Sequence, residues 1–166
     1  MSVTVLVGNP RPGSRTREAA TMVASAVTGA PPDHVIDLAG LGAGVLNADD
    51  PAVTRAMNTV SSSSLVVVAS PTFKATYSGL LKLFLDRFQG DTSWEGVLAL
   101  PFMLGSNPAH ALAPENTLRP LLSELGAVCA LPGLYLLDSA YTTDPAMEAY
   151  ARRWAPIVKA LTGKQA

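Results

Sequence analysis

A loop near the N-terminus carries residue types that could bind an anion. Residues 8–16 hold two arginines, Arg11 and Arg15, together with the hydroxyls of Ser14 and Thr16. Arginine supplies charge and forked donors, and the helix predicted after the loop offers free N–H groups at its positive end. This combination suits a phosphate group. An ordinary Gly/Pro turn followed by a Ser or Thr helix cap would have the same sequence pattern.

A second loop, residues 70–78, carries residue types that could hold a flat ring. Pro71, Phe73 and Tyr77 could form an apolar ledge, with the backbone amides around residues 73–75 facing the polar edge of the ring. Lys74 could balance a negative charge on a bound ligand. The same residues also suit aromatic anchors beneath the loop and a solvated lysine.

The chain lacks the residue patterns that several other chemistries require. The first loop has neither the glycine spacing of a dinucleotide fingerprint nor the Gly-Lys-Ser/Thr of a nucleoside-triphosphate loop. No Ser or Cys stands in a nucleophile-elbow setting, and two histidines and one cysteine lie far apart. We therefore expect no metal site and no catalytic side chain.

Short apolar runs alternate with helical stretches along the chain. Strands are predicted at 3–7, 34–38, 65–69, 97–104 and 131–137, and helices at 17–28, 51–61, 79–88, 112–125 and 145–161. Residues 39–50, rich in Gly and Asn, are predicted as a loop. Alternating strands and helices predict an α/β fold with a parallel sheet, for which the order 2-1-3-4-5 is natural with five strands. Its ligand should lie where the order reverses, which gathers both loops and residues 105–111 at one edge.

Composition fits one domain, residues 1–166, with 48% hydrophobic residues and a net charge of −1. The absence of a basic block argues against nucleic acid and anionic membranes as partners. The chain starts with a strand and has no long apolar run, so we expect no leader, no membrane span and a cytoplasmic location.

Four segments resemble NAD(P)H-dependent FMN reductases. Residues 8–16 resemble the Gly-Ser-x-Arg-x-x-Ser-x-Thr phosphate loop of that family, and residues 71–86 its Pro-x-Tyr-x-x-x-Tyr-x-Gly-x-Leu-Lys-x-x-x-Asp segment. Residues 104–110 are similar to its Gly-Gly/Ser loop ending in His, and residues 118–122 to its Leu-Lys/Arg-Pro-x-Leu helix. The resemblance covers nearly the whole chain and is nearest to the branch that supplies reduced flavin to sulfonate-type monooxygenases.

The resemblance implies a flavodoxin-like three-layer sandwich and a set of site residues. The phosphate of FMN would be held by Arg11, Ser14 and Thr16, with help from Asn9. The flavin would be lined by Pro71, Thr72, Phe73 and Lys74, and contacted by Gly105 and Ser106. Asn9 stands where the family usually has Ser, and Phe73 where it has Tyr, which removes any role for a phenolic hydroxyl there. Asn116 stands where that branch can have Tyr, which leaves its flavin-exchange behaviour open.

The activity implied is reduction of FMN by NADPH or NADH, with hydride passing from nicotinamide to flavin N5, and supply of reduced FMN to a partner monooxygenase. A homodimer or homotetramer is implied as well, for which the helices at residues 80–88 and 112–125 could form the interface; the same two helices could instead simply cover the sheet. Three alternatives stay open: a quinone, azo or chromate reductase with prosthetic FMN, a flavodoxin-type electron carrier without enzymatic activity, and a flavin-free protein-interaction domain on the same fold.

Overall fold

The computed structural model describes residues 1–47 and 49–163. The strands are β1 (Val3–Val7), β2 (His34–Asp37), β3 (Leu65–Pro71), β4 (Leu98–Gly105) and β5 (Leu134–Leu137). The α-helices are α1 (Arg15–Thr28), α2 (Pro51–Ser61), α3 (Gly79–Leu85), α4 (Arg119–Glu124) and α5 (Pro145–Thr162). Three further helical segments are η1 (Leu38–Leu46), η2 (Pro108–His110) and η3 (Pro114–Leu118).

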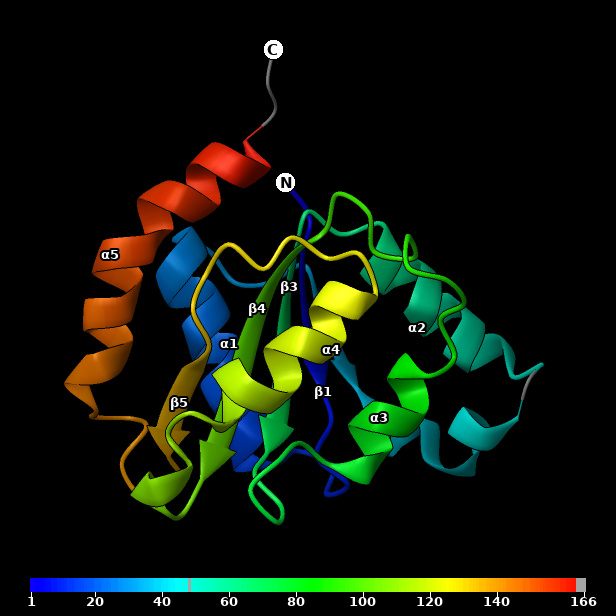
Figure 1. The fold of residues 1–166 in the computed structure, drawn as a ribbon, viewed down its shortest axis with the longest axis horizontal. Helices are drawn as coiled ribbons and strands as arrows, with labels where there is room; N and C mark the ends of the chain where they lie inside the picture. The colour runs from blue at the N-terminus through cyan, green and yellow to red at the C-terminus, as the bar shows by residue number, and fades with distance from the viewer. Residues whose placement is uncertain (48, 164–166) are drawn as a thin grey trace.

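The strands form one parallel sheet in the order β2-β1-β3-β4-β5, which confirms the predicted topology. Val3 of β1 pairs with Leu65 of β3, and Phe102 of β4 pairs with Leu134 of β5. The strands β3, β4 and β5 point downwards in the view of Figure 1, and because every pairing is parallel, all five carboxyl ends share the lower edge of the sheet. The order reverses between β1 and β3, and the loops that follow them diverge there and leave room for a ligand.

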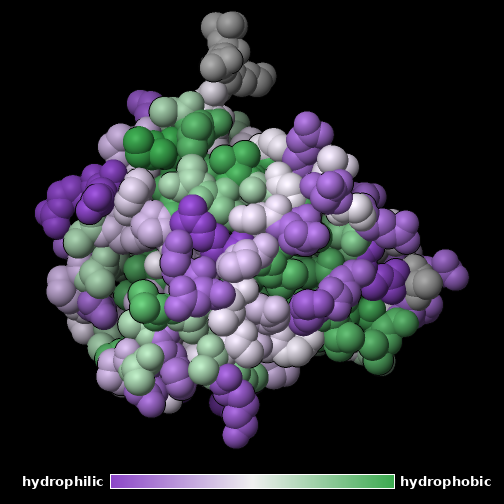
Figure 2. All heavy atoms as spheres, viewed as in Figure 1, coloured by the Kyte–Doolittle hydropathy of each residue, from purple (hydrophilic) through white to green (hydrophobic). Residues whose placement is uncertain are grey.

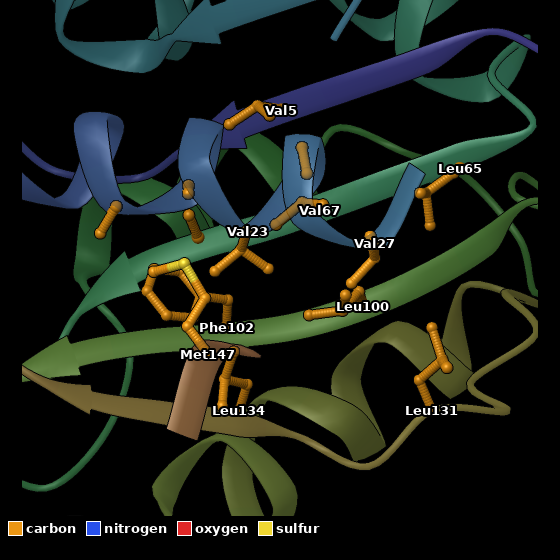
Figure 3. Packing of buried hydrophobic residues seen from close by; sticks show 14 of the residues in the cluster. Val5, Val23, Val27, Leu65, Val67, Leu100, Phe102, Leu131, Leu134 and Met147 are labelled. Atoms are coloured by element: carbon orange, nitrogen blue, oxygen red, sulfur yellow. The ribbon is translucent and has the colours of Figure 1, made fainter. Parts of the chain in front are cut away.

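Each face of the sheet is covered by its own set of helices (Figure 1). In β3, Leu65 and Val67 belong to the apolar cluster under α1 and α5, which is drawn in Figure 3. Val66 and Val68 belong to the opposite cluster, under α2, α3 and α4. Because both faces of a central parallel strand are buried, β3 has an uninterrupted apolar run rather than an alternating one.

The prediction of a loop at residues 39–50 is wrong for most of that segment. One of its residues, Ala48, lies outside the described residues. Leu38–Leu46 forms 3-10 turns joined across a kink at Gly42, whose φ is +52°. Leu38 and Val45 are buried and anchor the segment on the core. Glycine allows a loop, but its conformational freedom also permits the tight turns that apolar anchors can hold in place.

The helix predicted for residues 112–125 is interrupted. Pro114–Leu118 forms a single wide π-turn, closed by a hydrogen bond from Arg119 N to Pro114 O, and α4 starts only at Arg119. Pro120 has no N–H to donate to the carbonyl of Asn116, so a regular α-helical ladder cannot pass this point. Gly126, with φ of +86°, follows the last turn.

Several other predicted boundaries shift by one to three residues. The helix α1 begins at Arg15 rather than 17 because Ser14 caps it, α3 ends at Leu85 rather than 88, and β5 begins at Leu134 rather than 131. Pro101 fits inside β4 because of this late start. Ala99 N donates to Val128 O on the β5 side. Pro101 N faces the same side two residues later, before the pairing with β5 begins.

Candidate functional site

A cavity of about 410 Å³ opens at the carboxyl edge of the sheet, between the loop after β1 and the ends of β3, β4 and β5. It lies at the edge where the strand order reverses. Its lining residues are Asn9, Pro10, Arg11, Gly13, Ser14, Arg15, Thr16, Pro71, Phe73, Leu104 and Asp138.

The first loop is braced by Asn9. Its Nδ2 donates to Thr16 Oγ1 at 2.9 Å, and its Oδ1 accepts from Arg11 N at 2.9 Å. Both ends of the Asn9 amide are therefore used inside the loop. Because Thr16 Oγ1 accepts from Asn9, the proton of the Thr16 hydroxyl remains available to a ligand.

Ser14 caps α1 and completes a set of donors. Its Oγ accepts from Arg17 N at 3.4 Å, so its own proton is also free to donate. The residues Ser14 and Thr16 are buried at the floor of the loop, whereas Arg11 is exposed at its rim. Two hydroxyl donors, a guanidinium and the positive end of a 14-residue helix form a cradle for an anion.

Carboxylates hold this loop from both sides. Gly13, with φ of +59°, donates its N–H to Asp37 Oδ2 at 3.1 Å. On the other side, Arg15 donates to the carbonyl and carboxylate oxygens of Asp138, at 2.9 and 3.0 Å. The ends of β2 and β5 thus fix the position of the loop after β1.

The loop after β3 contains a tight two-residue turn. Phe73 and Thr76 exchange backbone hydrogen bonds of 2.9 and 3.1 Å, and the residues between them, Lys74 and Ala75, have φ of +52° and +65°. Positive φ at both central positions is the pattern of a type I′ turn, which normally contains Asn and Gly. Left-handed backbone costs other residues about 1–2 kcal/mol each. Such strain is typical of binding and active sites.

The loop after β4 approaches the same edge closely. Gly105 cannot carry a side chain, because a Cβ there would overlap the hydroxyl of Tyr135 and lie 2.9 Å from Thr72 Cβ. Tyr135 donates its hydroxyl to Asn107 O at 2.7 Å, and partial burial raises the pKa of this phenol. Thr72 Oγ1 is buried without a well-oriented hydrogen-bond partner among the described residues.

Six of the ten predicted site residues line the cavity: Asn9, Arg11, Ser14, Thr16, Pro71 and Phe73. The other four are not among its lining residues. Lys74 stands exposed at the tip of the turn, Ser106 is exposed beyond β4, and Thr72 faces Gly105. Sequence reasoning missed Leu104 and, with more consequence for the chemistry, Asp138 as lining residues. The position of Asp138 directly after the last strand of a parallel sheet was an available signal.

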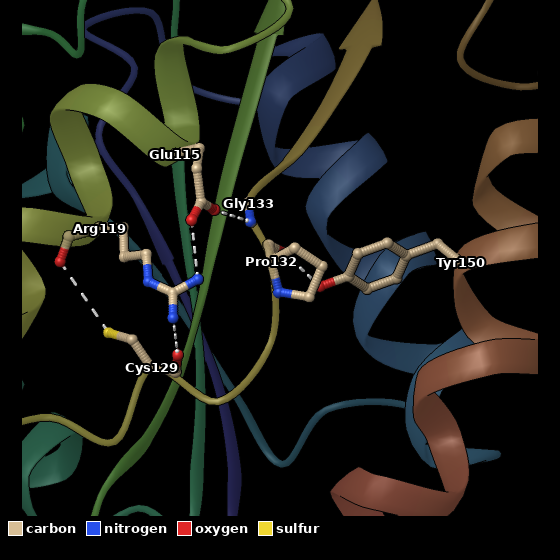
Figure 4. A network of polar contacts seen from close by, with 6 residues as sticks. All are labelled: Glu115, Arg119, Cys129, Pro132, Gly133 and Tyr150. Carbon is tan, nitrogen blue, oxygen red and sulfur yellow. Dashed lines mark hydrogen bonds and ion pairs between the residues drawn. The ribbon is translucent and has the colours of Figure 1, made fainter.

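A polar network holds the chain before β5 against the π-turn (Figure 4). Glu115 accepts from Arg119 Nη1 at 2.8 Å and from Gly133 N at 2.7 Å. Arg119 Nη2 donates to Cys129 O at 2.6 Å, and Tyr150 donates to Pro132 O at 2.7 Å. These bonds set where β5 starts, and therefore where Asp138 emerges at the site.

A larger hollow, of about 770 Å³, lies between α1 and α5 and contains no predicted site residue. Among the residues that the structure describes, no His, Cys, Asp and Glu side chains gather in a group that could hold a metal ion. None of the described helices is both long and apolar enough to span a membrane.

The family model and the curated relatives that match this chain have the same kind of name. The sequence model of the family described as NADPH-dependent FMN reductase matches residues 1–142. The FMN reductase (NADPH) of Escherichia coli (strain K12) is 36% identical over 91 residues, which cover 55% of this chain and 47% of that protein. The NADH-dependent FMN reductase SfnF of Pseudomonas fluorescens is 29% identical over 116 residues, 65% of this chain and 60% of that protein. The chain spans about half the length of the curated relatives that it matches.

Solved structures support the fold. A crystal structure of an NADH:FMN oxidoreductase in its apo form superposes with a TM-score of 0.83 at 24% identity, covering 97% of this chain and 88% of that one. An oxidoreductase from Corynebacterium diphtheriae gives a TM-score of 0.76 at 25% identity, with coverage of 98% and 95%.

Proposed function

This chain belongs to the NADPH-dependent FMN reductase family, and from that premise we propose that it binds FMN and reduces it with NADPH or NADH. The observation that carries the proposal is the single cavity in which an anion cradle at the start of α1 continues to an exposed aromatic side chain, Phe73. A ligand with a phosphate at one end and a flat ring at the other matches that arrangement.

The phosphate is assigned to Arg11, Ser14 and Thr16, with Asn9 as the brace that keeps the Thr16 proton free to donate. The ring is assigned to the ledge of Pro71 and Phe73 and to Thr72, Lys74, Gly105 and Ser106. Gly105 supports this assignment because it leaves no side chain between β4 and the loop after β3.

When bound, the flavin supplies the redox chemistry, accepting a hydride at N5 from the nicotinamide. The protein orients the ring and stabilises charge. The N–H groups of Lys74 and Ala75 have no acceptor in the described part of the chain, so they are free to donate to the polar edge of a ring. No side chain is required to act as an acid or a base, so we assign no catalytic residue.

The proposal also covers the domain, its location, its partner and its assembly. Residues 1–166 act as one FMN-binding domain in the cytoplasm, and the reduced FMN is passed to a partner monooxygenase.

The chain assembles as a homodimer or homotetramer. Apolar side chains exposed on helices support assembly: Leu83 is 44% exposed, and Figure 2 shows apolar surface over the C-terminal part of α5 and over η1. Light scattering coupled to size-exclusion chromatography tests the assembly, and a monomeric mass contradicts it.

The deciding experiment compares oxidation of NADPH and NADH in the presence of FMN, FAD and riboflavin. We expect oxidation that depends on flavin and is fastest with FMN. Flavin binding without oxidation of either nicotinamide would instead favour the electron carrier. Absence of both binding and oxidation would overturn the proposed function.

A further inference from the structure

Asp138 is the carboxylate of the cavity, and its position is fixed from two sides. Its backbone N–H donates to Gly105 O at 2.9 Å, which extends the pairing of β4 with β5 by one bond. Its carbonyl and its Oδ2 accept from Arg15 at 2.9 and 3.0 Å. The Asp138 side chain is 26% exposed, whereas that of Arg15 is 61% exposed.

The remaining polar groups of the cavity are mostly donors. Ser14, Thr16 and Arg11 offer protons, as an anion requires. Asn9 Oδ1, which could accept, already receives the N–H of Arg11. Among the lining side chains of the described structure, Asp138 alone carries a carboxylate. Its Oδ1 makes no hydrogen bond to another described residue, so it can accept from a ligand.

We propose that Asp138 Oδ1 accepts a hydrogen bond from a hydroxyl of the polyol chain that joins the phosphate of FMN to its ring, with Arg15 as the positioning residue. This inference rests on the proposed function. The hydroxyl groups of a polyol need acceptors when they leave water, and the donor-rich cradle offers few. A bare carboxylate near a phosphate would repel it, and the guanidinium of Arg15 neutralises that charge.

Three flavins separate this contact from the others. Lumiflavin has the ring alone, riboflavin adds the polyol chain, and FMN adds the phosphate. We expect Asp138→Ala to weaken riboflavin and FMN by similar factors, about tenfold to a hundredfold for a charge-assisted hydrogen bond, while lumiflavin binds as in the wild type. Flavin fluorescence quenching gives the dissociation constants without any turnover.

The role of Arg15 is tested by a double-mutant cycle. Arg15→Ala should weaken riboflavin in the wild-type background and have no effect on it in the Asp138→Ala background, because Arg15 acts on the polyol through Asp138. Asp91→Ala is the matched control, since Asp91 is exposed and precedes β4, at the opposite edge of the sheet. It should leave all three affinities unchanged.

Asp138→Asn provides a second variant if Asp138→Ala does not fold, since it keeps an oxygen for Arg15. It should weaken riboflavin by roughly fivefold, the difference between a charged and a neutral acceptor. Unchanged riboflavin affinity in these variants, or an equal loss for lumiflavin, would overturn the inference. A wild-type protein that binds none of the three flavins would overturn the proposed function itself, which is a separate result.

Discussion

Ser78 joins the two principal loops of the site by donating its hydroxyl to the carbonyl oxygen of Gly8. The same Oγ accepts from Leu81 N at 3.1 Å and so caps α3, while Ser78 N donates to Ser70 Oγ at 2.9 Å. Close packing accompanies these bonds, because a Cβ on Gly8 would lie 2.5 Å from Leu81 Cβ. One buried hydroxyl therefore fixes the loop after β1 relative to the loop after β3.

Ser78→Ala should lower the free energy of unfolding by about 1–3 kcal/mol, because it removes a helix cap and leaves the Gly8 carbonyl without this donor in a buried place. Urea unfolding measures the change. Ser61→Ala, at an exposed position at the end of α2, is the control and should stay within about 0.5 kcal/mol of the wild type. Equal stabilities of the two variants would show that the hydroxyl does not hold the loops together.

Arg11→Ala should weaken FMN by about tenfold to a hundredfold and leave riboflavin unchanged, because only FMN carries the phosphate that a guanidinium would bind. Titration of each flavin by fluorescence quenching measures both constants. Arg55→Ala removes the same charge from an exposed position on α2 and should change neither. If Arg11→Ala weakens both flavins alike, Arg11 does not recognise the phosphate.

Ala75→Gly should raise the free energy of unfolding by about 1 kcal/mol, since glycine adopts the φ of +65° without the steric cost that alanine meets. The expected sign is unusual, because alanine-to-glycine changes elsewhere destabilise by about 0.4–1 kcal/mol through the unfolded state. Ala130→Gly, in an exposed segment with ordinary φ, is the matched control and should lower stability. Destabilisation by both variants would mean that the turn is not strained.

The sheet and its strand order were predictable because short, mainly apolar runs, such as residues 65–69 of β3, alternate with helical patterns along the chain. The apolar runs of strands and the helical spacing of apolar residues are both local patterns, so they can be recognised in the sequence. The 3-10 turns of Leu38–Leu46 were not predictable in the same way. Gly and Asn allow many conformations, and only the burial of Leu38 and Val45 against the core selects one.

The anion loop was predictable because charge, hydroxyls and a helix start lie within a few consecutive residues. The pairing of Arg15 with Asp138 was not, because the two residues are 123 positions apart and meet only through the sheet. The strained turn at Lys74 and Ala75 also gave no signal, since neither residue type is typical of positive φ. Tertiary contacts that oppose local preference are the part of a site that sequence patterns omit.

Tyr150 should make the protein less stable at alkaline pH. Burial, assisted by the negative charge of Glu115, raises the pKa of its phenol above the ordinary value of 10.0 (Figure 4). The unfolded chain therefore loses this proton first. The contribution of Tyr150 to the free energy of unfolding is constant below about pH 10 and falls as pH rises further, by up to about 1.4 kcal/mol per pH unit.

Tyr150→Phe should cost about 1 kcal/mol at neutral pH, because the hydrogen bond to Pro132 O is lost, and this difference should shrink toward pH 11 or so. Urea unfolding at steps of pH from about 8 to about 11 measures both curves. Parallel curves would show that Tyr150 ionises alike in the folded and unfolded chains.

The open side of the cavity predicts that FMN binds reversibly, as a substrate. Phe73 is 48% exposed, so a ring against it keeps one face open for nicotinamide and gives up part of its stacking area. Lost contact area of this kind mainly raises the rate of dissociation. We expect protein that is colourless after dialysis and requires added FMN with a half-saturating concentration on the order of 1 μM.

Lys74→Ala distinguishes two roles for the exposed lysine at the tip of the turn. If Lys74 balances the charge of reduced flavin, the variant should reduce FMN several-fold more slowly, in line with loss of about 1 kcal/mol of stabilisation, while its affinity for oxidised FMN changes little. Stopped-flow reduction separates the two quantities. Protein that stays stoichiometrically yellow through dialysis, and reduces quinones without added FMN, would contradict binding as a substrate. That result would favour the reductase with prosthetic FMN and leave the phosphate and ring assignments as they are.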